Sequence, residues 1–253
     1  MDPIMQLKDL YAKNSKHSNY QILSNRLSKV IGDKQIDVKS RSEQERFDYI
    51  SNKIGLNGKN ILDIGGNSGF FTFEAIEKGA RCVHHYEGNK EHSNFVKKAA
   101  EVLQCGDKVE VTNSYYKFGT EEKRKYDVIF LLNVLHHLGD DFGDNSLSID
   151  AAKNLMANHL NVISDNTEYL IFQLGFCWKG DRNVGLFKNG TKEEMIDFVK
   201  SSIGDNWIIE GVGIPVLQDN NIQYNELNEE NILRNDKLGE FLNRPLFILK
   251  STL

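Results

Sequence analysis

Residues 61–73 read ILDIGGNSGFFTF and place a short apolar strand, a glycine-containing turn and an apolar helix start directly after one another. Asp63 lies at the end of the strand, and the turn contains Gly65, Gly66 and Gly69. Glycine and asparagine tolerate the left-handed backbone conformation that so tight a turn needs. The segment therefore predicts one strand-turn-helix unit of an α/β fold.

The same alternation continues along the chain. Apolar strand segments recur at residues 60–64, 81–86, 108–111, 126–132, 168–174, 207–216 and 245–251. Helical patterns fall between most of them, at residues 70–78, 91–103, 150–160 and 191–203. We therefore expect an α/β fold with a doubly wound, mostly parallel seven-stranded sheet and ligands at the carboxyl ends of the strands. The last two strands have no helix between them, which predicts an antiparallel edge strand.

The amino-terminal part of the chain has a different pattern. Residues 1–41 interleave apolar side chains with Lys, Asn and Ser, which predicts short helices outside the main core. A helix over residues 42–54 then leads into residues 42–253, which we expect to form one continuous domain because no Pro/Ser-rich linker interrupts them. Residues 16–21 (KHSNYQ) have the polar and aromatic mixture of a lid, although a plain surface helix fits them equally.

Composition narrows the classes of partner. The 253 residues are 40% hydrophobic and 26% charged, which excludes wholesale disorder. The 31 Lys and Arg residues against 36 Asp and Glu residues give a formal net charge of −5. A global basic field for capturing nucleic acid is therefore missing, so the sequence favours a small-molecule acceptor and disfavours nucleic acid.

The sequence also carries no membrane or disulfide pattern. No apolar run approaches the ~18 residues of a membrane helix, and the first ten residues lack the pattern of a signal peptide. We therefore expect no membrane contact and a cytoplasmic location. Cys82, Cys105 and Cys177 are odd in number and have no CxxC spacing, which argues against a disulfide framework and a structural zinc site.

The glycine turn distinguishes between nucleotide cofactors. A dinucleotide fingerprint needs glycine at its first, third and sixth positions, and counted from Gly65 the last two fall on Asn67 and Phe70, which disfavours NAD. Residues 63–69 (DIGGNSG) instead resemble the first motif of the class I S-adenosylmethionine-dependent methyltransferases, Asp/Glu-x-Gly-x-Gly-x-Gly, with Asn67 at the middle glycine. The resemblance implies a Rossmann-like methyltransferase fold and S-adenosylmethionine as cofactor, with S-adenosylhomocysteine as product.

Three further segments carry the resemblance, which covers residues 58–174. Glu87 ends the second strand, where the family places an acid on the ribose hydroxyls, and residues 113–114 follow the third strand, near the adenine in the family. Residues 133–138 (NVLHHL) resemble the fourth methyltransferase motif in its small-molecule form. The cofactor-binding residues so implied are Asp63, Gly65, Gly66, Asn67, Ser68, Gly69, Phe70, Glu87, Gly88, Asn113, Ser114 and Asn133.

His136 and His137 are the candidate catalytic residues. Adjacent side chains point in different directions, so at most one of them faces the acceptor as a base; alternatively the pair orders the turn and lines the cofactor pocket. The nearby run GDDFGD, with Asp140, Asp141 and Asp144, offers ligands for a divalent ion but equally fits a solvated loop. We expect no metal.

Trp178, Lys179 and Arg182 follow the strand at residues 168–174 and are the candidate substrate-binding residues. A tryptophan there can wall a pocket, and the two cations can receive a phosphate or carboxylate. A solvated basic loop is the alternative reading of the same residues.

The resemblance implies a methyltransferase that moves a methyl group in line to an oxygen or nitrogen acceptor, and the charge and the Lys179/Arg182 loop favour a small molecule such as a sugar or an anionic metabolite. Two alternatives stay open. An RNA-modifying methyltransferase would need a basic track, for which Lys97–Lys98 and Lys123–Arg124–Lys125 are the candidates. A non-catalytic module would bind S-adenosylmethionine without turnover. The sequence predicts neither the acceptor atom nor the oligomeric state.

Overall fold

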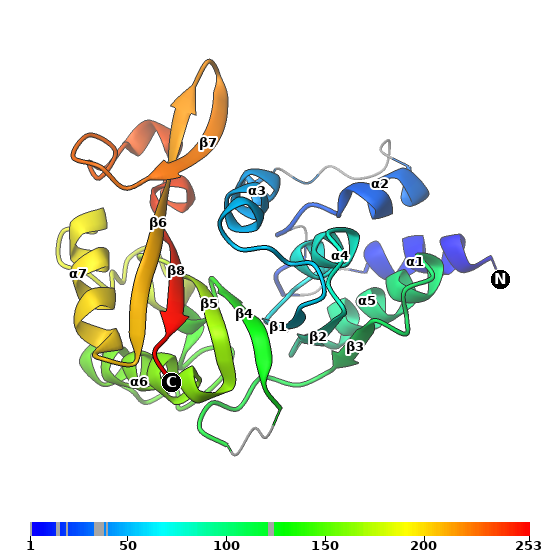
Figure 1. The fold of residues 1–253 in the computed structure, drawn as a ribbon, viewed down its shortest axis with the longest axis horizontal. Helices are drawn as coiled ribbons and strands as arrows, with labels where there is room; N and C mark the ends of the chain where they lie inside the picture. The colour runs from blue at the N-terminus through cyan, green and yellow to red at the C-terminus, as the bar shows by residue number, and fades with distance from the viewer. Residues whose placement is uncertain (1, 14–15, 19, 33–37, 39, 121–123) are drawn as a thin grey trace. The chain divides into compact units, whose positions relative to one another are not determined.

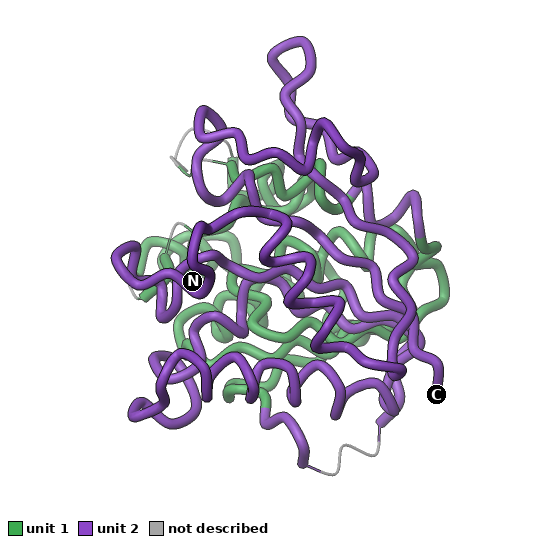
Figure 2. The backbone as a smooth tube through the Cα atoms, turned by 90° about the vertical axis from the view of Figure 1, so that its left-hand side faces the viewer, with its two compact units in different colours: residues 1–47, 54–116 green, residues 48–53, 117–253 purple. Residues whose placement is uncertain are grey.

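The computed structural model describes residues 2–13, 16–18, 20–32, 38, 40–120 and 124–253. The chain forms two compact units, which Figure 2 distinguishes by colour. Unit 1 comprises residues 1–47 and 54–116, and unit 2 comprises residues 48–53 and 117–253.

Unit 1 holds three parallel strands in the order β3-β2-β1 (Figure 1). Asp63 lies opposite His85 in the register between β1 and β2. The elements of unit 1 are α1 (Pro3–Tyr11), α2 (Asn25–Ile31), the first residues of α3 (Glu43–Lys53), β1 (Asn60–Ile64), α4 (Phe70–Glu77), β2 (Cys82–Tyr86), α5 (Lys90–Val102) and β3 (Val109–Thr112). The strand-turn-helix unit that the sequence predicts at residues 61–73 is thus β1, its turn and the start of α4.

The amino-terminal helices are part of unit 1. Helix α1 begins with Asp2, whose side chain accepts a hydrogen bond from Ile4 N, and with Pro3 at its first position, a pair that favours a helix start. The Tyr11 ring of α1 packs 5.2 Å from the Phe95 ring of α5. A division into an appendage of residues 1–41 and a domain of residues 42–253 remains a prediction.

Unit 2 holds five strands in the order β4-β5-β8-β6-β7. Strands β4 and β5 are parallel, whereas β8 is antiparallel to both β5 and β6. The elements that unit 2 adds to the last residues of α3 are β4 (Tyr126–Leu132), η2 (Leu135–His137), α6 (Ile149–Val162), η3 (Ser164–Asn166), β5 (Thr167–Gln173), η4 (Trp178–Gly180), α7 (Lys192–Ile203), β6 (Trp207–Gln218), β7 (Asn221–Glu226), η5 (Asp236–Leu238), η6 (Phe241–Asn243) and β8 (Leu246–Ser251). The antiparallel strand that the sequence predicts therefore lies between two neighbours, and β7 forms the end of the order.

Strand β7 is an eighth strand, within the described residues, that the sequence pattern does not predict. Its residues NIQYNE are mostly polar and exposed, so they lack the apolar run by which a strand is recognised. It forms a hairpin with β6 through Asp219 and Asn220, both with positive φ (48° and 63°), which suits the right-handed strand twist. Tyr49 Oη donates to Glu226 Oε1 at 2.7 Å and fastens the end of the hairpin to the last residues of α3.

The predicted fold class is confirmed: parallel strands joined through helices make up unit 1 and begin unit 2. Residues 128–131 of β4 are fully buried, as expected for a strand that is covered on both faces. Among the described residues, no helix has both the length and the apolar character needed to span a membrane.

Candidate functional site

The turn after β1 has the left-handed backbone that its sequence predicts. Gly65, Asn67 and Gly69 have φ values of 69°, 54° and 82°. Asparagine adopts this conformation more readily than other residues with a side chain, so Asn67 fits the place of the middle glycine. Helix α4 begins directly after Gly69.

The backbone amides of this turn are all engaged within unit 1. The N–H groups of residues 65–70 each donate a hydrogen bond to a protein acceptor. Those acceptors are Tyr86 O for Gly65 (2.8 Å) and Gly66 (3.3 Å), Glu87 Oε2 for Asn67 (2.8 Å), Asn67 Oδ1 for Ser68 (2.8 Å), Gly66 O for Gly69 (2.9 Å) and Gln21 Oε1 for Phe70 (2.9 Å). A phosphate-binding turn needs free amides, so this geometry does not fit a pyrophosphate.

Asp63 places a carboxylate beneath the turn. Its side chain is buried, and Oδ2 accepts a hydrogen bond from Thr72 Oγ1 at 2.7 Å. His85 Nδ1 lies 2.9 Å from Thr72 Oγ1 and 3.7 Å from Asp63 Oδ2. Oδ1 has no hydrogen-bond partner within the described part of unit 1, so it can accept from the ammonium of an amino-acid ligand.

Glu87 lies at the end of β2 with both carboxylate oxygens held by backbone amides. Oε2 accepts from Asn67 N at 2.8 Å and Oε1 from Asn89 N at 2.7 Å. Each oxygen keeps a further lone pair, so the carboxylate can still accept two hydroxyl groups. The residues of unit 1 thus fit the ribose and the ammonium of S-adenosylmethionine.

The remaining predicted cofactor residues of unit 1 lie close to Glu87. A Cβ on Gly88 would meet the Tyr115 ring at 2.4 Å, so glycine permits the close approach of that ring. Asn113 Nδ2 donates to Glu87 O (2.9 Å) and to Gly88 O (3.2 Å) and so braces the end of β2. Ser114 is exposed. A contact of Asn113 or Ser114 with adenine remains a prediction.

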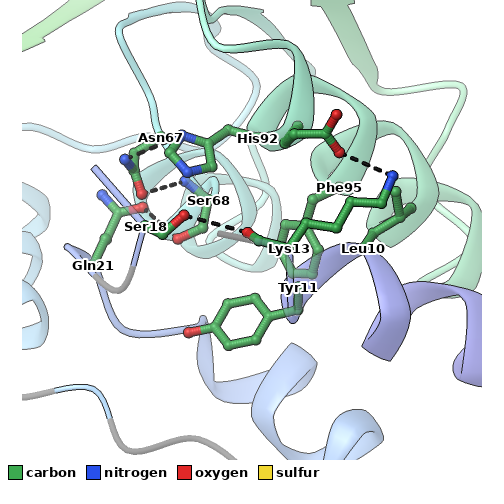
Figure 3. A pocket seen from close by; sticks show the side chains of 10 residues that line it. Leu10, Tyr11, Lys13, Ser18, Gln21, Asn67, Ser68, His92 and Phe95 are labelled. Atoms are coloured by element: carbon green, nitrogen blue, oxygen red, sulfur yellow. Dashed lines mark hydrogen bonds and ion pairs between the residues drawn. The ribbon is translucent and has the colours of Figure 1, made fainter. Parts of the chain in front are cut away.

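Gln21 is a residue of this region that the sequence analysis places only in a lid or a plain surface helix. Its Oε1 accepts from Phe70 N (2.9 Å) and from Ser68 Oγ (3.2 Å), so it caps the start of α4 (Figure 3). Asn67 Nδ2 donates to His17 O at 3.2 Å. His17 and Gln21 therefore contact the glycine turn, while Asn19 falls outside the described residues.

A pocket opens beside this contact, lined by Gln21, Asn67, Ser68 and residues of α1 and α5 (Figure 3). His92 of α5 lines it as well, with Nδ1 at 3.4 Å from Asn67 Nδ2. Burial lowers the pKa of His92, which favours the neutral ring, and the Nδ1 of a neutral ring can accept from the Asn67 amide.

In unit 2, the turn after β4 is held by side chains. Asn133 has a φ of 61°, its Nδ2 donates to Gln173 Oε1 at 2.9 Å, and its Oδ1 accepts from Arg244 Nη1 at 2.8 Å. Gln173 Nε2 donates to Arg244 O at 3.0 Å, which closes a ring of three residues. The orientation of the Asn133 amide is therefore fixed at both ends.

Arg244 also forms an ion pair with Glu240 at 2.6 Å. Burial acts to raise the pKa of Glu240, but the Arg244 charge and hydrogen bonds outweigh burial and hold that pKa below its ordinary value. Sequence reasoning misses Gln173, Glu240 and Arg244, because no local pattern links residues so far apart in the chain to Asn133.

The two histidines of the turn have different surroundings. His136 is buried, and its Nδ1 accepts from Gly175 N at 3.2 Å. His137 is partly exposed, with Nδ1 at 3.4 Å from Asp141 Oδ2 and 4.0 Å from Asp140 Oδ2. His136 thus holds the local chain in place, whereas His137 lies beside carboxylates. Asp144 instead accepts from Ser146 N and Oγ.

The predicted substrate loop packs on the same turn. Trp178 is buried, and its Nε1 donates to Leu138 O at 2.8 Å. Lys179 Nζ lies 4.4 Å from the centre of the Trp178 ring and donates to Asn145 O at 3.0 Å, whereas Arg182 is exposed. The structure brings Trp178 and Lys179 to the turn of residues 133–138, which we call the histidine turn. Substrate contacts by Trp178, Lys179 and Arg182 remain predictions.

Comparisons with known proteins show what this chain is similar to. A family model described as "Conserved hypothetical protein 95" matches residues 21–132, which include the glycine turn and Glu87. The tRNA U34 carboxymethyltransferase of Helicobacter acinonychis is 29% identical over 97 residues, 36% of this chain and 36% of the relative. Over these residues the chain is similar to methyltransferases. The expected Rossmann-like fold is confirmed.

A second curated relative is the tRNA U34 carboxymethyltransferase of Nautilia profundicola, 30% identical over 117 residues, 44% of this chain and 36% of the relative. The matched part thus spans about a third of the length of the curated relatives. A crystal structure of WbdD bound to a kinase inhibitor is 16% identical, covers 96% of this chain and 47% of that chain, and has a TM-score of 0.60. The last likeness shows the fold alone.

The comparisons correct one expectation. The sequence favours a small-molecule acceptor, such as a sugar or an anionic metabolite, and disfavours nucleic acid, and both preferences are wrong because the curated relatives carry the name of a tRNA-modifying enzyme. The physical reason is that the net charge of −5 is a sum over two units with different charge. Unit 1 carries 16 Lys and Arg against 14 Asp and Glu, whereas unit 2 carries 15 against 22.

Proposed function

We propose that this protein is an S-adenosylmethionine-dependent methyltransferase that modifies tRNA. The observation that carries the proposal is the similarity to tRNA U34 carboxymethyltransferases in two organisms. The charge distribution supports it, because the excess of acidic residues lies in unit 2 and leaves unit 1 able to face a polyanion.

The cofactor site of the proposal lies in unit 1. Asp63 would accept the ammonium through Oδ1, and Glu87 would accept the ribose hydroxyls. When bound, S-adenosylmethionine supplies the methyl group and becomes S-adenosylhomocysteine. The turn at residues 65–70, whose amides are already bonded, keeps its shape without a ligand and so presents the two carboxylates in fixed positions.

We assign the base to His137 rather than to His136. His136 Nδ1 is committed to Gly175 N, and the ring is buried. The His137 ring is partly exposed, and Asp141 beside its Nδ1 stabilises the imidazolium that forms when Nε2 takes a proton. The base would remove the proton that an oxygen or nitrogen acceptor loses as its new bond to carbon forms.

Basic side chains on unit 1 are the proposed contacts for RNA phosphates. Lys13, Lys16 and Lys97 are exposed, and Lys97 belongs to the first basic track of the sequence analysis. Arg124 and Lys125 of the second track are exposed in unit 2, while Lys123 lies outside the described residues. Contacts of this kind make affinity fall steeply with salt.

The test is transfer of label from methyl-labelled S-adenosylmethionine to tRNA that lacks wobble modifications. We expect label in tRNA, tRNA affinity that falls as salt rises, and a mass increment on one nucleoside that identifies the transferred group. Asp63→Asn, which removes the negative charge at the cofactor site, is the matched inactive control. If the protein binds S-adenosylhomocysteine but leaves the tRNA unlabelled, the proposed RNA acceptor is wrong and the proposed cofactor site still stands.

A further inference from the structure

A chain of three buried side chains lies beneath the glycine turn of unit 1. Asp63 comes from β1, His85 lies opposite it on β2, and Thr72 is the third residue of α4. Asp63 is 3% exposed, and Thr72 and His85 are fully buried. The Thr72 hydroxyl oxygen lies 2.7 Å from Asp63 Oδ2 and 2.9 Å from His85 Nδ1.

The direction of both hydrogen bonds follows from chemistry. A carboxylate only accepts, so the single hydroxyl proton of Thr72 points at Asp63. Thr72 Oγ1 must then accept from His85, which places the imidazole proton on Nδ1. His85 therefore donates to Thr72, and Thr72 donates to the oxygen of Asp63 that faces away from the open Oδ1.

The glycine turn rests directly on this chain. A Cβ on Gly66 would meet His85 Cε1 at 2.4 Å and Asp63 Oδ2 at 2.6 Å. The backbone of the turn and the Asp63 carboxylate are thus held by the same imidazole, so displacement of His85 would move both.

His85 is an unusual choice for so buried a strand position. Its Nε2 has no hydrogen-bond partner among the residues that the structure describes, and a buried nitrogen without a partner costs about 1–3 kcal/mol. A leucine would avoid that cost. What the histidine supplies instead is the hydrogen bond from Nδ1 to Thr72.

We propose that His85 and Thr72 are positioning residues that orient the Asp63 carboxylate toward the amino-acid part of S-adenosylmethionine. The inference rests on the proposed cofactor site and adds two residues that the methyltransferase motif does not contain. Neither residue touches the cofactor; each acts through Asp63. Their contribution is therefore confined to ligands that carry the ammonium.

The test compares two nucleosides by calorimetry. S-adenosylhomocysteine has the amino-acid part, and 5′-methylthioadenosine lacks it. Thr72→Val, which keeps the shape and removes the hydroxyl, should weaken S-adenosylhomocysteine by roughly 5- to 30-fold and methylthioadenosine by less than about twofold. Thr72→Ser should restore binding. His85→Asn, whose amide nitrogen takes the place of Nδ1, should bind better than His85→Leu.

Asp63→Asn provides the internal control. In that background Thr72→Val should have almost no further effect on S-adenosylhomocysteine, because the group it orients has lost its charge. Equal losses for both nucleosides, or an undiminished effect of Thr72→Val beside Asp63→Asn, would overturn the inference and leave the cofactor site intact. If the unaltered protein binds neither nucleoside, the cofactor proposal falls and the inference falls with it. Should His85→Leu fail to fold, the isosteric Thr72→Val carries the comparison alone.

Discussion

The turn after β1 in unit 1 and the turn after β4 in unit 2 are built in opposite ways. Both contain an asparagine with positive φ, Asn67 at 54° and Asn133 at 61°. The first turn is held through its backbone amides and leaves lone pairs on Asp63 and Glu87 for a ligand. The second is held through the Asn133 side chain, by residues of β5 and of the segment before β8.

We expect this difference to separate cofactor binding, at the turn after β1, from catalysis, at the turn after β4. A turn with bonded amides and open carboxylates can recognise a cofactor without changing shape, because the backbone is already satisfied. A turn that carries histidines needs side chains fixed from outside, because a short 3₁₀ segment such as η2 has few hydrogen bonds of its own. Variants of the two turns should therefore fail in different assays.

The largest effect is expected at the histidine turn. His137→Ala should lower turnover by about 10²- to 10⁴-fold, the usual span for a general base, and leave S-adenosylhomocysteine affinity nearly unchanged. His136→Asn keeps a polar group near Gly175 and serves as the comparison in single-turnover kinetics. Equal rates for His137→Ala and the unaltered enzyme would remove the base from this turn.

Substitutions in the glycine turn after β1 should instead change the affinity for the cofactor. Gly66→Ala places a methyl group 2.4 Å from His85 Cε1, so the turn or the Asp63 carboxylate must shift, and S-adenosylhomocysteine should bind roughly 100-fold more weakly. Gly106→Ala is the matched control, since a Cβ there meets nothing within 4 Å. Calorimetry on both variants decides the point, and wild-type affinity for Gly66→Ala would place the cofactor elsewhere.

Arg244→Gln tests how the second turn is held. Loss of the guanidinium leaves Glu240 without its ion-pair partner and should destabilise the fold by about 2 kcal/mol at pH 7. The Glu240 pKa is held low, so the stability that this carboxylate contributes is present above its unfolded pKa and lost as pH falls through the folded pKa. The difference in melting temperature between variant and parent should therefore shrink in acid.

The control for Arg244→Gln is Lys250→Gln, which removes an exposed ion pair with Glu210 and should change stability little. Turnover of Arg244→Gln should also fall, because Asn133 loses one of its two amide contacts. A melting difference that does not depend on pH would show that Glu240 is not the group left unpaired.

The smallest effect is expected at Gln21. Gln21→Leu removes the acceptor for Phe70 N and Ser68 Oγ, at a cost of about 1 kcal/mol. Backbone amides near residues 16–21 should then exchange with solvent faster, and α4 should be affected only at its first turn. Unchanged exchange would mean that the amino-terminal segment is held by its other contacts, such as Asn67 to His17 O.

Much of the fold is readable from the sequence because its signals are local. The apolar run at residues 126–132 coincides with β4, and residues 61–73 give β1, the turn and the start of α4. The places of Asp63 in β1 and of Glu87 directly after β2 are readable in the same way, whereas their cofactor roles come from the family resemblance. Strand β7 is missed because it is polar, and the place of β8 between β5 and β6 depends on pairing between distant segments.

The support of each site is not local, and the sequence does not predict it. The turn after β1 depends on hydrogen bonds of Thr72 and His85, which come from different elements. The turn after β4 depends in the same way on Gln173, Glu240 and Arg244. The acceptor class is misjudged for a related reason: a net charge of −5 describes the whole chain and no surface in particular.

The most direct test of the cofactor site is a calorimetric titration of S-adenosylhomocysteine into the unaltered protein and into Glu87→Ala. The carboxylate of Glu87 is the only charged group proposed for the ribose, so its loss should weaken binding by about 1–3 kcal/mol, or roughly 5- to 150-fold. Glu101→Ala, an exposed acid on α5, should bind as the unaltered protein does. Equal affinity for Glu87→Ala and the unaltered protein would contradict the assignment of unit 1 as the cofactor site.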